Sequence, residues 1–231
     1  LARLVASAPE DAIAAVAQRL DDAGATVCDA AELMRILRRA KQEASLLIAL
    51  ADLGGVWDAV EVTRALTRFA DAAVGCALRF LLLEADAAGK LALPSRDAPE
   101  DGCGLVILAL GKHGAGELNY SSDVDLVVLF DPDAPALPPD SAAQALYVRL
   151  TKGIVKLLQE RTEDGYVLRV DLRLRPDPGS TQIAISLPAA ATYYETLGQN
   201  WERAAFIKAR AVAGDKRIGE AFLKELAPFI W

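Results

Sequence analysis

The chain has 231 residues, a length that suffices for one large domain or a core domain with a helical flank. Its net charge is −7, and 53% of its residues are hydrophobic. An acidic chain lacks the basic stripe that binds phosphate backbones, and no apolar run approaches the roughly 18–20 residues that span a bilayer, so neither a nucleic-acid nor a membrane partner is predicted. The single histidine, His113, argues against Ser-His-Asp, Cys-His and HExxH chemistry and directs any catalysis towards carboxylates and metal ions.

Residues 1–90 are predicted to form a helical N-terminal region. Apolar residues recur at three- and four-residue spacing over 11–20, 32–51 and 60–83, with a break at Leu53-Gly54-Gly55. Asp58, with Glu61 three residues later, is predicted to begin the third helix as a capping box. A short basic cluster is interpreted as a solvated helix face rather than a phosphate or partner contact; it comprises Arg35, Arg38, Arg39 and Lys41.

Residues 91–231 are predicted to form the catalytic core. A linker over 92–104 leads into two neighbouring strands, 105–110 and 124–130, with a glycine-rich turn between them. A proline-rich loop over 131–140, a helix over 141–159, a third strand over 166–176 and a further strand over 182–187 follow. Helices are predicted from Pro188 onwards, with one amphipathic run from Trp201 to Arg210 and a closing helix over 216–231. Trp201 is interpreted as a core residue, with a platform for base stacking as the alternative.

Three aspartates on the predicted strands indicate a divalent-metal site. Asp123 and Asp125 are two residues apart, so they point to the same face of a strand, where two nearby charges are costly unless a cation joins them. Asp171 lies on the charged face of the third strand, between Arg169 and Arg173. These carboxylates predict one or two Mg²⁺ ions, or Mn²⁺ in their place. A solvated strand face with salt bridges is the alternative for the third strand.

The glycine-rich turn is predicted to approach nucleotide phosphates. Gly111, with Gly114 and Gly116, would let the backbone come close to a pyrophosphate, and the hydroxyls of Ser121 and Ser122 could donate to its oxygens. Lys112 is interpreted either as a phosphate ligand or as an exposed loop lysine.

The motifs resemble those of known enzymes. Gly-Lys followed by Ser-Ser-Asp-x-Asp and a strand with a third Asp is the pattern of polymerase-beta-type nucleotidyltransferases. More narrowly, GKHGAGELNYSSDVDLVVLFD, YVLRVDLRLRPDPGS and YYETLGQNWERAAFIKARAVAGD resemble the glutamine-synthetase adenylyltransferase family, over most of residues 35–216. The resemblance implies an α+β fold: a small mixed sheet carrying the carboxylates, surrounded by helices, with a helical N-terminal extension.

The resemblance also implies which of the family's two heads this is. Asn119-Tyr120-Ser121-Ser122-Asp123 and Gln199-Asn200-Trp201-Glu202-Arg203 match the adenylyl-removing head, whereas the adenylylating head more often reads Tyr-Gly-Ser-Asp and Trp-Glu-His. His113 departs from the aliphatic residue usual in the glycine turn. The implied reaction is phosphorolysis of adenylyl-tyrosine on glutamine synthetase, releasing ADP. Arg173, Arg175, Lys208 and Arg210 are the implied phosphate-positioning residues.

The expected partners are glutamine synthetase, ATP or ADP, phosphate and a nitrogen-signalling regulatory protein. Three scattered cysteines without a C-x-x-C pair fit a reducing cytoplasm. The chain starts without methionine and stops within an apolar helical pattern, so we expect a piece of a longer, two-headed protein. Two alternatives stay open: ATP-dependent adenylylation of the same tyrosine, and a catalytically silent domain that binds a nucleotide or a regulator.

Overall fold

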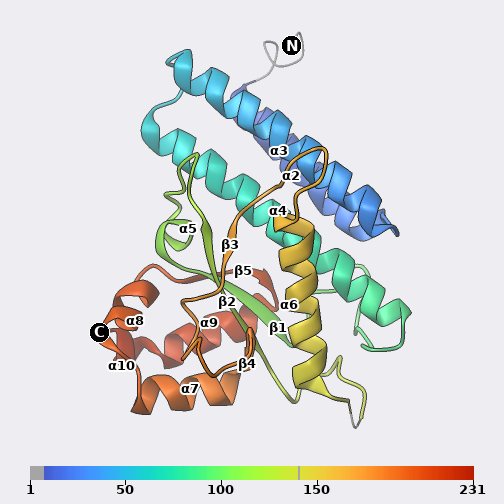
Figure 1. Ribbon diagram of the computed structural model, residues 1–231, viewed down its shortest axis with the longest axis vertical. Helices are drawn as coiled ribbons and strands as arrows, with labels where there is room; N and C mark the ends of the chain where they lie inside the picture. The colour runs from blue at the N-terminus through green and yellow to red at the C-terminus, as the bar shows by residue number, and fades with distance from the viewer. Residues whose placement is uncertain (1–7, 140) are drawn as a thin grey trace.

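The computed structural model describes residues 8–139 and 141–231, and the first part of the chain is a layer of long helices (Figure 1). These helices are α2 (Pro9–Thr26), α3 (Ala30–Leu53) and α4 (Ala59–Ala87), which confirms the three predicted helices within longer elements. The capping box is confirmed as well. The Asp58 carboxylate accepts hydrogen bonds from the backbone of Val60 and Glu61, and the Glu61 carboxylate accepts one from the Asp58 N–H at 2.8 Å. Residues 1–7 of the predicted helical region and residue 140 of the predicted loop lie outside the described residues.

The second part is built on a mixed sheet. Its strands are β1 (Leu105–Ala109), β2 (Val124–Phe130), β3 (Val170–Asp171), β4 (Ala184–Ser186) and β5 (Arg210–Gly214). The order is β3-β2-β1-β5, with β4 also paired to β2. Strand β1 is antiparallel to β2 and β5, whereas β2 is parallel to β3 and β4. The predicted α+β fold with a mixed sheet is therefore confirmed.

Helices cover both faces of the sheet, and two hydrophobic cores result. Alternate residues of β1 face opposite sides: Leu105 and Ile107 pack with α2, α3, α4 and α6 (Ala143–Gln159), while Val106 and Leu108 pack with the C-terminal helices. Those helices are α7 (Leu187–Thr196), α8 (Asn200–Phe206), α9 (Lys216–Glu225) and α10 (Ala227–Ile230). Figure 1 shows them gathered at the end of the molecule away from α2 and α3. Burial on both faces explains the unbroken apolar run of β1.

Three sequence predictions about the core part are wrong in detail. The glycine-rich stretch between β1 and β2 is a one-turn helix, α5 (Gly111–Ala115), rather than a turn. The third strand is reduced to the two residues of β3, because the Arg175 side chain donates to the carbonyls of Leu172 and Pro178 and holds the chain in a turn. The helix expected to continue through Arg210 gives way to β5, which pairs with the otherwise open edge of β1.

The predicted burial of Trp201 is also wrong. This side chain is 50% exposed, and Phe206 at the other end of α8 enters the core instead. The division of the chain at residues 90 and 91 stays a prediction. Helix α4, on the N-terminal side of that division, packs against α6 and β5 and shares a hydrophobic core with the sheet.

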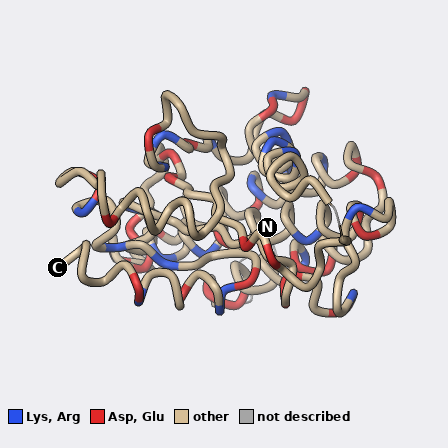
Figure 2. The backbone as a smooth tube through the Cα atoms, turned by 90° about the horizontal axis from the view of Figure 1, so that it is seen from below, with Lys and Arg blue, Asp and Glu red and all other residues tan. Residues whose placement is uncertain are grey.

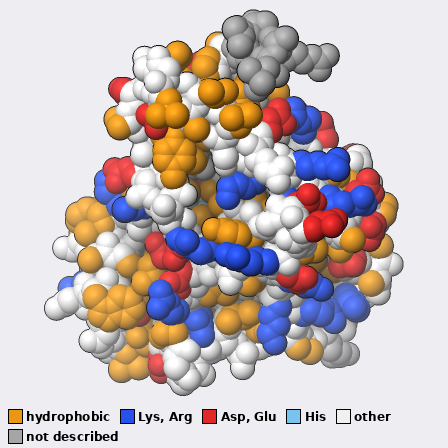
Figure 3. Space-filling model, turned by 45° about the horizontal axis from the view of Figure 1, so that its top comes forward, with side chains coloured by type: hydrophobic (Ala, Val, Ile, Leu, Met, Phe, Trp, Pro, Cys, Tyr) orange, Lys and Arg blue, Asp and Glu red, His pale blue; other side chains and the backbone are white. Residues whose placement is uncertain are grey.

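Charges of both signs are distributed over the fold. Figure 2 shows Lys and Arg interspersed with Asp and Glu along the backbone, and Figure 3 shows the same mixture on one face of the molecule. Within residues 8–139 and 141–231, no helix combines the length and apolarity needed to cross a membrane.

Candidate active site

The pairing of β2 with β3 brings the three predicted carboxylates to one place. Asp125 and Asp171 are partners in the parallel register of these strands, and Asp123 precedes β2 by one residue. Asp125 is half-buried, and burial raises its pKa, with further contributions from the charges of Asp171 and Asp123. The charges of the two outer aspartates therefore act on the central one, Asp125.

Gly111 makes room for the central carboxylate. Its φ is +54°, and a Cβ atom at this position would lie 2.8 Å from Oδ2 of Asp125. The chain is fixed beside it by a hydrogen bond from the Leu110 N–H to the Asp125 carbonyl at 2.9 Å. The sequence predicts that this glycine lets the backbone approach phosphate; the structure adds that it accommodates Asp125.

The outer two carboxylates are each bound by an arginine. Arg173 donates from Nε to both oxygens of Asp171, at 3.0 and 2.9 Å, and from Nη2 at 2.5 Å. These bonds hold the pKa of Asp171 below its usual value. Arg169 donates to Asp123 and to the Ser121 carbonyl. The sequence identifies Arg169 only as a neighbour of Asp171, because its hydrogen-bond partners lie 46 and 48 residues away.

The three carboxylates fit a divalent cation in ligand type and charge, although not in their present positions. Within the described residues, no three His, Cys, Asp or Glu side chains stand in an arrangement that could hold a metal ion. The reason is visible in the contacts, since Asp123 and Asp171 are turned to Arg169 and Arg173. Arg169, Asp123 and Arg173 are open to solvent, although the Asp171 side chain is only 13% exposed, and an exposed cationic partner can be exchanged for another at little cost.

The other basic candidates are distributed between the fold and the surface. Arg175 donates to three carbonyls of its own loop, those of Leu172, Pro178 and Thr181. Arg210 pairs with Asp71 at 2.9 Å and donates to the carbonyls of His113 and Gly114, both at 3.2 Å. Lys112 and Lys208 are exposed. Arg173 is the predicted phosphate-positioning residue that the structure places directly beside the carboxylates.

The histidine of α5 has a structural partner that the sequence could not identify. Nε2 of the fully buried His113 lies 2.8 Å from Oδ1 of Asp71 on α4, and Arg210 of β5 binds the same carboxylate. Nδ1 of His113 has no hydrogen-bond partner within the described residues. The pair joins α5, which carries Gly111, to the helical layer, and its residues are separated by 42 positions in the chain.

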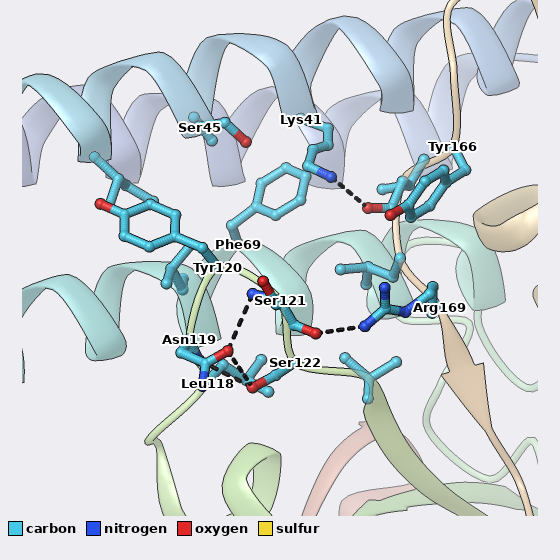
Figure 4. A pocket seen from close by; sticks show the side chains of 16 residues that line it. Lys41, Ser45, Phe69, Leu118, Asn119, Tyr120, Ser121, Ser122, Tyr166 and Arg169 are labelled. Carbon is cyan, nitrogen blue, oxygen red and sulfur yellow. Dashed lines mark hydrogen bonds between the residues drawn. The ribbon is translucent and has the colours of Figure 1, made fainter.

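The loop before β2 closes on itself. Oδ1 of Asn119 accepts hydrogen bonds from the Ser121 N–H and the Ser122 hydroxyl, both at 3.0 Å, and the Asn119 N–H donates to the Ser122 hydroxyl at 3.1 Å. Both predicted phosphate donors therefore lie in a loop shaped by Asn119, and the Ser122 hydroxyl already bonds within it. Figure 4 shows this loop facing α3, α4 and the segment from Tyr166 to Arg169 across a pocket.

Helix α3 fixes the segment that leads to Asp171. Arg38 is 1% exposed and donates to the carbonyls of Gly165 at 2.9 Å, Leu157 at 3.1 Å and Glu160. Lys41 donates to the Val167 carbonyl at 3.1 Å. The interpretation of this basic cluster as a solvated face is wrong for Arg38, which is buried, and holds for Arg35 and Arg39, which are exposed.

Comparison with known proteins identifies relatives of the whole chain. The sequence profile of the family described as glutamate-ammonia ligase adenylyltransferase matches residues 3–225. The chain is 58% identical, over its full length, to a bifunctional glutamine synthetase adenylyltransferase/adenylyl-removing enzyme of Bradyrhizobium diazoefficiens. It is 55% identical over 99% of its length to the protein of that name from Xanthobacter autotrophicus. In both comparisons the chain spans 23% of the relative's length.

Proposed function

We propose that this chain, which belongs to the glutamate-ammonia ligase adenylyltransferase family, removes AMP from an adenylylated tyrosine of glutamine synthetase by phosphorolysis. The observation that carries the proposal is the convergence of Asp123, Asp125 and Asp171 through the pairing of β2 with β3. Carboxylates grouped in this way are the ligands with which proteins hold the divalent cations of phosphoryl transfer. The names of the relatives support glutamine synthetase as the protein on which the chemistry occurs.

In the proposed reaction an oxygen of inorganic phosphate attacks the phosphorus of the adenylyl group. The bond from that phosphorus to the tyrosyl oxygen breaks, and the tyrosyl oxygen takes up a proton. The products are ADP and glutamine synthetase with an unmodified tyrosine side chain. No covalent enzyme intermediate is needed, which suits a site without an activated nucleophile. Arg173 beside Asp171 would orient the attacking phosphate, with Arg175, Lys208 and Arg210 as the weaker candidates because of their other contacts or positions.

A divalent cation, Mg²⁺ or Mn²⁺, would be held by Asp123, Asp125 and Asp171 and would supply neutralisation of the phosphate charge. The protein's own contribution is to keep the three carboxylates together. Gly111 leaves space for Asp125, and Arg169 and Arg173 bind Asp123 and Asp171 in the absence of a cation. Lys112 and Ser121 would contact phosphate oxygens.

We further propose a cytoplasmic location and a nitrogen-signalling regulatory protein as a partner of the longer protein.

The alternative with the same site is ATP-dependent adenylylation of the tyrosine. The names of the relatives include both activities, so the direction depends on local motifs. Residues 119–123 and 199–203 of this chain resemble the removing head. In both motifs a side chain accepts a hydrogen bond from a backbone N–H and so fixes the local backbone. Asn119 organises its loop, and the buried Glu202 accepts the Gln199 N–H at 2.7 Å at the start of α8. A catalytically silent domain is less consistent with three retained carboxylates.

The test is an incubation of the chain with adenylylated glutamine synthetase, Mg²⁺ and phosphate, with ADP followed by chromatography. The Asp123→Ala/Asp125→Ala double variant is the control. ADP from the unaltered chain alone supports the proposal. AMP incorporation from ATP into unmodified synthetase, without ADP release in the first assay, would reverse the direction. Silence in both assays would favour the binding-domain alternative.

A further inference from the structure

We propose that the pocket between α3, α4, the loop of residues 118–122 and the segment of residues 166–169 binds the aromatic ring of the adenylylated tyrosine (Figure 4). This inference rests on the proposed function, because it assigns a place to one part of that substrate. The pocket would thereby select a tyrosyl phosphodiester over an aliphatic one.

The position of the pocket agrees with the bond that must be broken. A tyrosine joined to AMP has its phenolic oxygen directly on the phosphorus, so its ring lies next to the reacting phosphate. The pocket shares Ser121, Ser122 and Arg169 with the surroundings of the carboxylates. Arg169 reaches from the pocket wall to Asp123 and also binds the Ser121 carbonyl. A ring inside the pocket would therefore be adjacent to the carboxylate group.

The size and lining of the pocket suit one ring. Its volume is about 150 Å³, below the range of about 300–1,000 Å³ that is usual for sites that enclose a whole small ligand. The apolar wall includes Ile48 of α3, Phe69 of α4 and Leu118 of the loop. Tyr120 and Tyr166 supply two further aromatic side chains at its edges. Aromatic rings contact one another favourably edge to face or offset, which gives a phenyl ring an advantage over a short aliphatic chain.

The walls of the pocket are held in place without a ligand. The Tyr120 hydroxyl donates to Asp52 of α3 at 2.9 Å, which joins the loop to the helix across the pocket. On the opposite side, Lys41 lies 5.2 Å from the centre of the Tyr166 ring, and Arg161 lies 5.4 Å from it. Cations over the face of a ring attract it and limit its movement. A pocket that is already formed loses little conformational entropy when it binds a ring.

The decisive variant fills the pocket from α3. Ser45 is half-buried and lines the pocket, whereas its neighbour Leu46 is 49% exposed and does not line it. We expect Ser45→Phe to raise KM for adenylylated glutamine synthetase about tenfold, which corresponds to about 1.4 kcal/mol, and to leave KM for phosphate unchanged. Leu46→Phe is the matched control and should change neither constant. A wild-type KM in a Ser45→Phe protein with an unchanged thermal midpoint would overturn the inference.

A binding measurement separates this inference from the proposed function. Ligand-detected NMR on the unaltered chain should show binding of O-phospho-L-tyrosine and at least tenfold weaker binding of O-phospho-L-serine. Equal binding of the two would overturn the inference even if the chain releases ADP. Conversely, a chain that releases no ADP contradicts the proposed function, while the phosphoamino-acid comparison still tests the pocket. Because that comparison needs no variant, it also decides the matter if Ser45→Phe fails to fold.

Discussion

Two arginines differ in how they hold the third carboxylate and the chain that leads to it. Arg173 binds Asp171 from the surface, with 83% of its side chain exposed. Arg38 lies beneath the segment leading to the same aspartate, is 1% exposed, and binds only backbone carbonyls. An exposed ion pair contributes little to stability and can exchange partners, whereas a buried guanidinium is costly to remove because several carbonyls lose a hydrogen-bond donor at once. The ion pair at Asp171 can thus exchange partners, whereas the segment that leads to Asp171 is held in place.

The largest effect is expected from removing the charge of Asp125, the carboxylate that lies between the two arginine-bound aspartates. Burial and two neighbouring aspartates raise the pKa of Asp125, so its ionised form at neutral pH opposes folding. Asp125→Asn should therefore abolish ADP release and yet raise the thermal midpoint measured in EDTA at pH 7. A carboxyl with a raised pKa incurs its penalty as the pH rises from the unfolded to the folded pKa. The stabilisation should accordingly shrink as the pH falls towards about 4, the usual Asp pKa. A lower midpoint at pH 7 would contradict the electrostatic account.

The hold on the segment that leads to Asp171 is tested by Arg38→Met. The substitution introduces an apolar side chain of similar length and removes one hydrogen-bond donor from each of the carbonyls of Met34, Leu157 and Gly165. We expect a loss of about 3 kcal/mol in the free energy of unfolding, measured by urea denaturation. Arg39→Met, an exposed position on the same helix, is the control and should change it by less than about 0.5 kcal/mol. Equal effects of the two substitutions would remove the contrast between buried and exposed arginines.

The space that Gly111 leaves for Asp125 is tested by substitution of this glycine. Gly111→Ala places a methyl group 2.8 Å from Asp125 Oδ2 at a positive φ, so the carboxylate must move. We expect at least a tenfold loss of ADP release and about 1–2 kcal/mol of destabilisation. Gly89→Ala, outside the site, is the matched control, since its φ is +67° and no atom lies within 4 Å of the added Cβ. It should incur a similar backbone cost and keep its activity.

The smallest effect on the fold is expected from Arg173→Ala. Removing this exposed side chain should leave the thermal midpoint nearly unchanged. If Arg173 orients the incoming phosphate, KM for phosphate should rise several-fold, whereas KM for adenylylated glutamine synthetase should not change. Steady-state kinetics with phosphate varied at saturating protein substrate measure the difference. Unchanged kinetics would remove Arg173 from the proposed site.

The sequence by itself determined the features that depend on neighbours along the chain. The helical spacing of apolar residues predicted α2, α3 and α4, and the separation of Asp58 from Glu61 predicted the cap of α4. The apolar runs of β1 and β2 and the two-residue spacing of Asp123 and Asp125 were equally local signals. These patterns are reliable because helix and strand periodicity, and the hydrogen bonds of a cap, involve residues only a few positions apart.

Only the tertiary structure decided the features that depend on distant partners. Residues 210–214 follow a helical pattern but become β5, because the edge of β1 offers hydrogen bonds that local propensity does not include. The sequence indicates a surface position for Arg38, but in the structure its side chain binds the carbonyl of Gly165, 127 residues away. The partner of His113 is Asp71 of α4, at 2.8 Å, which the sequence does not reveal. Trp201 is exposed because α8 buries Phe206 instead. Burial and pairing are decided by what packs against a residue, and the chain order does not contain that information.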